Sequence, residues 1–152
     1  MTPEAKLVSM GLVLPEAPRP VANYVPFKIG GNTLYLSGQG PRRSDGTMLS
    51  GKVGRDVTVE EAYEHAKLVG LGLLAAAKAA VGDLARIEAL KVLGMVNAVP
   101  EFTDHPKVID GCSDLLVAVL GERGRHARSA VGMASLPMNI SVEIEAVMRI
   151  HE

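Results

Sequence analysis

The sequence has few of the features that mark secreted or nucleic-acid-binding proteins. Only 3% of its 152 residues are aromatic, tryptophan is absent, and cysteine occurs once, at Cys112. A single cysteine excludes an internal disulfide and fits a reducing compartment, so we expect a cytoplasmic protein. The 16 basic and 17 acidic residues nearly balance. The balanced charge indicates no excess of basic residues to contact phosphates, and the few aromatic residues leave few side chains that could stack on bases. The composition therefore predicts no nucleic-acid partner.

Long apolar runs and metal-binding patterns are also missing. The stretch "VGLGLLAAAKAAVG" comes closest to a membrane span, but Lys78 interrupts it and it is shorter than the roughly 20 residues a spanning helix needs. We therefore expect no membrane partner. The first twenty residues lack a basic start followed by an apolar block and a cleavage site, so we expect no signal peptide. The four histidines show no metal-ligand spacing, which predicts no metal site.

The residues that are present predict a single α+β domain over residues 1–152, and 47% of them are hydrophobic and available for a core. Thr58 followed by Glu61 has the form of a helix capping box, and Gly82 is a typical stop signal. Gly30 and Asn32 favour a hairpin turn. The expected elements are an extended N-terminal arm over residues 1–25, a hairpin over 27–39, helices over 58–82 and about 103–121, and strands over 87–96, 127–133 and 140–150.

The last strand predicts how the layers pack. Its apolar residues alternate strictly, which gives one wholly apolar face that should meet the helices. These residues are Ile140, Val142, Ile144, Ala146, Met148 and Ile150. The other face carries Ser141, Glu143, Glu145, Val147 and Arg149, and it is either bare to water or covered by another copy of the chain. The pattern predicts a sheet with both helices on one face, as in ferredoxin-like or chorismate mutase-like folds.

Three segments in this order resemble the Rid/YjgF family of imine deaminase-like proteins. They are "LYLSGQGP", "ARSAVGMASLP" and "VEIEAV", and the likeness extends from Tyr24 to Arg149. The form "GRHARSAVG" resembles a divergent branch. The resemblance implies a chorismate mutase-like fold and a homotrimer with ligand clefts between subunits. It also implies hydrolysis of reactive 2-imino or enamino acids to 2-keto acids and ammonia, without a cofactor.

The resemblance also implies roles for particular residues. Arg128 matches the arginine that binds the substrate carboxylate, and a guanidinium suits this role because it is a rigid fork of donors that stays charged when desolvated. Glu143 matches the glutamate that positions the attacking water. The residues that match positions bordering the ligand are Tyr24, Ser37, Gly38 and Ala130. We expect Ser37 to form hydrogen bonds rather than act as a nucleophile, because no histidine or lysine lies at a spacing that would activate its hydroxyl.

Two positions depart from the family pattern. Ala130 stands where the family usually has cysteine, although its backbone N–H still suits a ligand contact. Asp110 stands where the family often has asparagine, and a carboxylate there would oppose an anionic ligand or take a different role. Both departures bear on the substrate more than on the fold.

Alternatives remain open for Arg128 and for the function. Arg128 is either a ligand-binding residue or one half of a structural salt bridge between subunits, with Glu143 or Glu145 as the acid. Tyr24 either closes over a ligand or packs the arm. For the whole protein, the alternative to catalysis is a non-catalytic homotrimer that binds a small carboxylate metabolite. Endoribonuclease activity is the third reading, and the charge balance and few aromatics argue against it.

Overall fold

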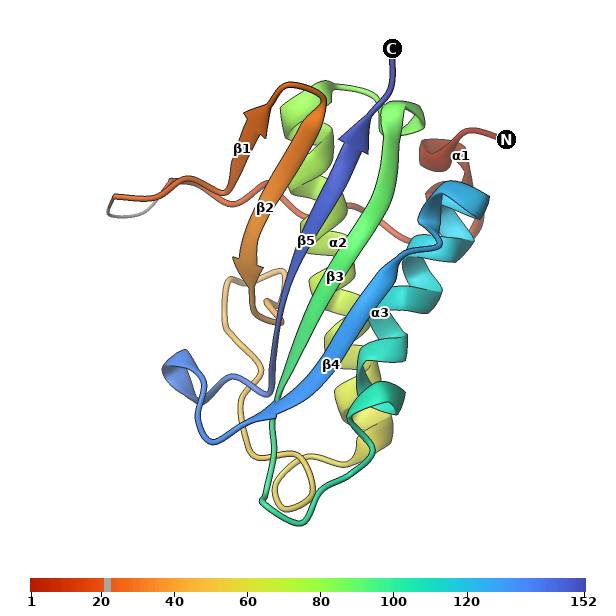
Figure 1. Ribbon diagram of the computed structural model, residues 1–152. Helices are drawn as coiled ribbons and strands as arrows, with labels where there is room; N and C mark the ends of the chain where they lie inside the picture. The colour runs from red at the N-terminus through yellow and green to blue at the C-terminus, as the bar shows by residue number, and fades with distance from the viewer. Residues whose placement is uncertain (21–22) are drawn as a thin grey trace.

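The computed structural model describes residues 1–20 and 23–152, and its elements follow the predicted order (Figure 1). The structure also contains one short helix in the N-terminal segment, which we expected to form an extended arm. The helices are α1 (Pro3–Ser9), α2 (Val59–Val81) and α3 (His105–Leu120), and the strands are β1 (Phe27–Gly30), β2 (Thr33–Gln39), β3 (Ile87–Asn97), β4 (Ala127–Met133) and β5 (Val142–Ile150). Three short 3₁₀ turns, η1 (Leu84–Arg86), η2 (Gly121–Gly124) and η3 (Pro137–Asn139), connect them.

The five strands form one sheet in the order β1-β2-β5-β3-β4. Neighbours are antiparallel except β3 and β4, which are parallel and are joined by the α3 crossover. The long helices α2 and α3 lie side by side against the same face of the sheet (Figure 1). This confirms the predicted two-layer arrangement. It also places β4, with Arg128, at one edge of the sheet and beside α3.

The helix boundaries follow from local signals that the sequence predicts. At the start of α2, the Thr58 hydroxyl accepts the Glu61 N–H at 3.1 Å, and the Glu61 carboxylate accepts the Thr58 N–H at 3.2 Å. Both bonds satisfy backbone donors that the first helical turn leaves without partners. The helix ends at Gly82, whose φ of 81° is left-handed and suits glycine. Helix α3 begins after Asp104 and ends before Gly121.

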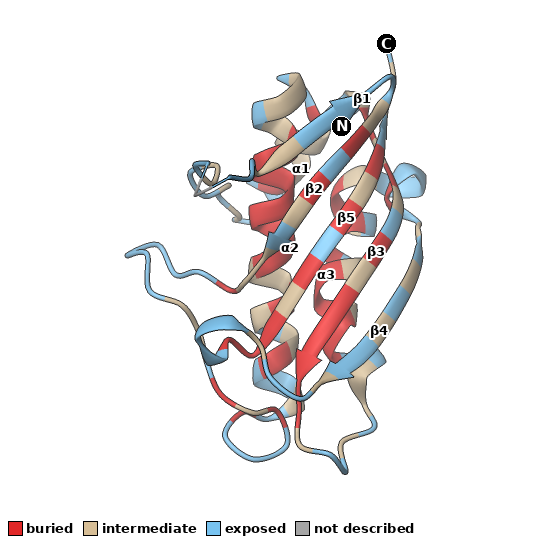
Figure 2. Cartoon of the chain, turned by 60° about the vertical axis from the view of Figure 1, so that its left-hand side comes forward, coloured by how far each residue is buried: buried red, intermediate tan, exposed pale blue. Residues whose placement is uncertain are grey.

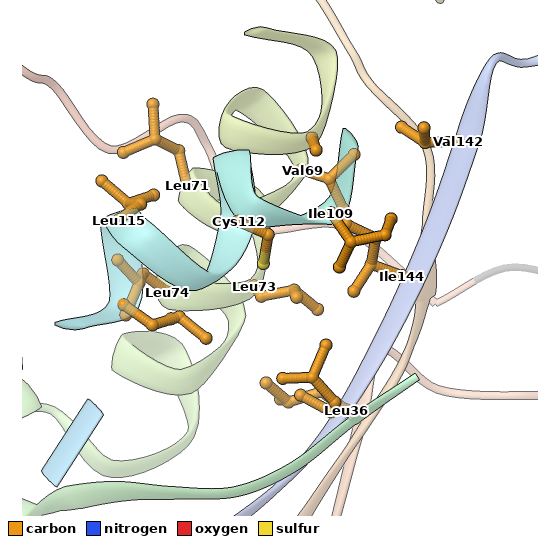
Figure 3. Packing of buried hydrophobic residues seen from close by; sticks show 14 of the residues in the cluster. Leu36, Val69, Leu71, Leu73, Leu74, Ile109, Cys112, Leu115, Val142 and Ile144 are labelled. Atoms are coloured by element: carbon orange, nitrogen blue, oxygen red, sulfur yellow. The ribbon is translucent and has the colours of Figure 1, made fainter. Parts of the chain in front are cut away.

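The core lies between the helices and the sheet, and its central leucines, isoleucines and valines interdigitate (Figure 3). Glycine lets α3 approach α2 closely, because a Cβ atom at Gly111 would lie 1.9 Å from the Tyr63 carbonyl oxygen. A side chain there would push the helices apart. The contact therefore fixes the distance between α3 and α2, and with it the backbone position of the neighbouring Asp110.

The other face of the sheet is not covered by any element of the described chain (Figure 2). It mixes charged residues with apolar ones, since Tyr35 is 52% exposed and Val131 is 39% exposed. Ser141 differs from the expectation that it lies on this face. Strand β5 begins one residue later, and Ser141 is buried with its hydroxyl 2.7 Å from Nδ1 of His65.

The N-terminal segment is held against the body of the protein. Leu7 of α1 is only 3% exposed and belongs to the core. The Glu4 carboxylate accepts the backbone N–H of Leu84 at 3.1 Å and lies 3.7 Å from Nζ of Lys78. These contacts explain why a helix forms here: Thr2 caps it, Pro3 suits its first turn, and burial of Leu7 stabilises it.

Candidate functional site

Arg128 lies on the edge strand β4 and points toward α3. The register pairs it with Val92, whose side chain is buried under the helices. Its Nη1 atom lies 2.9 Å from Oδ1 of Asp110 and donates to the Ser113 hydroxyl at 3.0 Å, while Nη2 donates to the Pro106 carbonyl at 3.3 Å. The guanidinium is therefore held by three groups of α3, and its side chain is 24% exposed.

The acidic partner of Arg128 in this chain is Asp110. Glu143 and Glu145 project from β5 on the opposite face of the sheet, so within one chain they do not pair with Arg128. The salt bridge between subunits to Glu143 or Glu145 stays a prediction. The Asp110 side chain is 44% exposed. A partly exposed pair of this kind contributes about 0–1 kcal/mol to folding. Because its side chain is exposed, Asp110 is accessible to a ligand.

A serine and a histidine that the sequence did not single out complete this cluster. Nδ1 of His126 lies 2.7 Å from the Gly124 carbonyl oxygen, and Nε2 lies 2.9 Å from Oγ of Ser113. A carbonyl only accepts, so Nδ1 carries a proton, and in the neutral imidazole the Ser113 hydroxyl donates to Nε2. Ser113 thus accepts from Arg128 and donates to His126. No sequence spacing indicated this pair, because the β3–α3–β4 crossover brings the two residues together.

These side chains border a surface groove of about 250 Å³. Its lining residues are Asp110, Ser113, Val117, Arg125, His126 and Arg128. The groove is small and polar and holds both signs of charge, with one apolar wall at Val117. A site of this size and chemistry suits a small charged metabolite.

Glu143 belongs to a second cluster on the uncovered face. It pairs with Met95 of β3 and lies beside β2, where its Oε2 would be 2.6 Å from a Cβ atom at Gly38. Glycine at position 38 therefore makes room for the carboxylate. Burial raises the pKa of the Glu143 carboxyl above its ordinary value, and the like charge of Glu145 raises it further. A carboxyl with a raised pKa exchanges protons more readily near neutral pH.

Ser37 lies in β2 next to Gly38, and Tyr24 lies in the segment before β1. The Ser37 hydroxyl donates to the Val25 carbonyl at 2.6 Å, and its backbone N–H donates to the Pro26 carbonyl at 3.0 Å. Ser37 thus ties the segment before β1 to β2. Tyr24 is 57% exposed, so in a single chain it packs little surface and is accessible to another molecule.

The predicted site residues fall into two groups that one chain does not bring together. Arg128 and Ala130 face α3, because they pair with Val92 and Gly94 on the helix side of β3. Glu143 pairs with Met95 on the other side. Strands β4 and β5 are separated by β3, and two strand spacings span about 9.5 Å. A site that uses Arg128 and Glu143 on one ligand must therefore form between chains.

A larger hollow, of about 400 Å³, is bordered by the start of α2 and by Lys107 of α3. Its lining residues are Val59, Glu60, Tyr63, Glu64 and Lys107. The Tyr63 hydroxyl donates to Asp114 at 2.7 Å, and this bond, together with burial, raises the pKa of Tyr63 to about 12. The hydroxyl is therefore committed to a structural bond, and the hollow contains none of the predicted site residues.

Two further classes of site are absent from the described part of the chain. Residues 1–20 and 23–152 hold no group of three or more histidine, cysteine, aspartate or glutamate side chains that could bind a metal ion. None of the helices described is long and apolar enough to cross a membrane.

Comparisons with known proteins match nearly the whole chain. A sequence model of the family described as "YjgF/chorismate mutase-like, putative endoribonuclease" matches residues 4–147. Protein TCP17 of Trypanosoma cruzi is 39% identical over 149 residues, which cover 97% of this chain and 93% of that protein. A 2-iminobutanoate/2-iminopropanoate deaminase of Dermatophagoides farinae is 31% identical over 135 residues, covering 88% and 91%.

A solved structure agrees with these sequence matches. The crystal structure of Atu1372 from Agrobacterium tumefaciens, described as a protein of unknown function, superposes with a TM-score of 0.91 at 50% identity. The superposition covers 98% of this chain and 94% of that one. Together with the family match, it confirms the predicted chorismate mutase-like fold.

Proposed function

The chain belongs to the Rid/YjgF family of YjgF/chorismate mutase-like proteins, and we propose that it hydrolyses 2-imino acids to 2-keto acids and ammonia. The reaction takes place in clefts between the subunits of a homotrimer. The relative from Dermatophagoides farinae is named for this kind of activity. The buried single cysteine fits a reducing compartment, so we propose that the protein works in the cytoplasm.

One observation carries the proposal: Arg128 and Glu143 point to opposite faces of the sheet. A single copy cannot direct both at one small ligand. A second copy docked with its uncovered face against the edge strand of the first would bring its Glu143 to the Arg128 of its neighbour. The exposed apolar side chains of Tyr35 and Val131 on that face support such docking.

In this arrangement each residue has a definite task. Arg128 binds the carboxylate of the imino acid and fixes its orientation. Glu143 of the neighbouring copy holds a water molecule and accepts one of its protons as the oxygen bonds to the imine carbon. The C=N electron pair moves to nitrogen, which takes up the proton. The hydroxyl proton is then transferred to the nitrogen through Glu143, the C–N bond breaks with its electron pair on nitrogen, ammonia leaves, and the C–O bond becomes the C=O bond of the keto acid.

No cofactor is required for these steps because the imine carbon is already electrophilic. Ser37 and Gly38 keep the wall beside Glu143 in place, since the first anchors β2 to the preceding segment and the second makes room for the carboxylate. The backbone at Gly38 and Ala130 borders the ligand, and Tyr24 lies at its rim.

The test is an assay in which an amino-acid oxidase generates the imine in the presence of the purified protein. Imine is trapped with semicarbazide, and we expect less trapped imine and faster appearance of the 2-keto acid. Arg128→Ala and Glu143→Gln should lose this effect, whereas Arg19→Ala, at an 85% exposed side chain, should keep it. Wild-type protein that leaves the imine lifetime unchanged would refute the proposed activity.

A second candidate function is binding without turnover. It is favoured by the Asp110 carboxylate 2.9 Å from the guanidinium of Arg128, which partly neutralises the group that holds the substrate. In that case a small carboxylate metabolite would bind to the homotrimer, as calorimetry would show, while the imine lifetime stayed unchanged.

A further inference from the structure

The ion pair between Asp110 and Arg128 has unused hydrogen-bonding capacity on both sides. Arginine has five N–H donors, and aligned hydrogen bonds from Arg128 go to Ser113 and to the Pro106 carbonyl. Within residues 1–20 and 23–152, three of the five N–H groups therefore have no aligned acceptor. The Nε–H is among them, and it lies on the same edge of the guanidinium as Nη2. Such an edge suits the two oxygens of a carboxylate.

Asp110 has the complementary capacity. Its Oδ1 lies 2.9 Å from Nη1 of Arg128, but the aligned N–H bonds of the guanidinium point to other acceptors. The Asp110 side chain is 44% exposed and lines the same groove. Its carboxylate can therefore accept hydrogen bonds from a ligand while it stays beside Arg128.

The neighbouring residues hold this pair of charges in place. Ser113 fixes Nη1 of Arg128, and His126 fixes the Ser113 hydroxyl through the bond to its Nε2. The close contact of Gly111 with α2 fixes the backbone of α3 that carries Asp110. The groove thus presents a positively charged edge held by hydrogen bonds and, beside it, a negatively charged carboxylate.

We propose that this pair is a receptor for zwitterions, and that Asp110 selects ligands with a positively charged nitrogen next to the carboxylate. Protonated 2-imino acids and α-amino acids have this form. A 2-keto acid has the carboxylate alone, and the charge of Asp110 repels it. The inference rests on the proposed function for the identity of the site. It adds that the site binds the positively charged imino-acid substrate more tightly than the 2-keto acid product, which is therefore released.

The experiment compares two probes with the same carbon skeleton, L-2-aminobutyrate and 2-oxobutyrate, by isothermal titration calorimetry with the wild-type protein in its native oligomer. We expect aminobutyrate to bind about tenfold more tightly, as expected for a charge contact worth roughly 1.4 kcal/mol. Equal affinity, tighter binding of oxobutyrate, or no detectable binding of aminobutyrate would overturn the inference. This comparison needs no variant, so it does not depend on a mutant that folds.

The matched variants are Asp110→Asn and Asp114→Asn. The first removes the charge and keeps the shape, so the preference for aminobutyrate should fall about tenfold and oxobutyrate should bind at least as well as before. The second removes a carboxylate one turn along the same helix, which bonds Tyr63 and lies outside the groove, and it should leave the preference unchanged. An unchanged preference in Asp110→Asn would overturn the inference.

The result separates this inference from the proposed activity. If the protein does not shorten the imine lifetime but prefers aminobutyrate in a manner that depends on Asp110, the zwitterion receptor stands and the proposed hydrolysis fails. If it hydrolyses imines and Asp110→Asn leaves the ligand preference unchanged, the hydrolysis stands and the receptor fails.

Discussion

The carboxylate of Glu143 occupies the space that a side chain at position 38 would need: a Cβ atom on Gly38 would lie 2.6 Å from its Oε2. The obstacle is the far end of a flexible side chain, so Gly38→Ala should fold and should displace the carboxylate. Displacement of a catalytic group by about 1 Å can cost up to roughly 100-fold in rate, and we expect a 10- to 100-fold lower kcat with little change in Tm. Gly30→Ala is the control, since its nearest atom is 3.9 Å away. Equal kcat in both variants would show that Glu143 does not need this space.

Arg128→Ala should lose ligand binding and keep the fold. Removing a guanidinium that holds a carboxylate in a partly dry groove costs roughly 2–5 kcal/mol of binding or transition-state stabilisation. The loss to folding should be about 1 kcal/mol or less, because the pair with Asp110 is partly exposed. Arg128→Lys should rescue only in part, since an ammonium cannot reproduce the fork. Thermal melting and imine turnover separate the two roles: a variant with a much lower Tm and normal turnover per folded trimer would assign Arg128 to structure.

Glu145→Gln should move the pH dependence of turnover to lower pH. Burial is the main cause of the raised pKa of Glu143, and the charge of Glu145 is the second. Removing that charge lowers the pKa of Glu143, so the water-holding carboxylate stays ionised to a lower pH and the acidic limb of kcat against pH shifts downward. Glu60→Gln, on the exposed side of α2, is the charge-matched control. A limb that moves equally in both variants, or in neither, would contradict the assignment.

His65 should make the folded state less stable in mild acid. Burial lowers the pKa of this histidine and is the largest cause; the negative charge of Glu61 opposes the shift, and the positive charge of Arg43 adds to it. Because the folded pKa lies below the unfolded value of about 6.5, the unfolded state binds the proton first. Stability is thus fully present above about pH 6.5 and falls as the pH drops below it. Urea unfolding at pH 7.5 and 5.5 should show a smaller acid loss in His65→Gln than in wild type, and an equal loss would contradict this role.

The uncovered sheet face should be the assembly surface. Sedimentation at micromolar concentration is expected to give a trimer, because three-fold contacts would cover Tyr35 and Val131. Val131→Asp should dissociate the assembly by placing a charge in that contact. Val13→Asp, at an 84% exposed side chain outside the sheet, should not. A wild-type monomer would contradict the proposed clefts as well as the assembly.

Local patterns in the sequence were sufficient for the secondary structure and the layers. The capping box at Thr58 and Glu61 and the stop at Gly82 set the ends of α2. The alternation in β5 set which face meets the helices. These signals depend on residues within about one helical turn or on neighbours along a strand, so the sequence alone contains them. The helix α1 was missed because its stability depends on burial of Leu7 against the rest of the chain.

Tertiary packing decided which residues lie together in the candidate site. Nothing near Arg128 in the sequence indicates that Asp110 and Ser113 lie against it, since α3 reaches β4 only through the crossover and the close contact at Gly111. The strand register likewise turned Arg128 and Glu143 to opposite faces. The sequence supplied the residues that we predict to carry the chemistry. The fold determined which of them meet, because side-chain contacts between distant segments depend on how helices and strands pack in three dimensions.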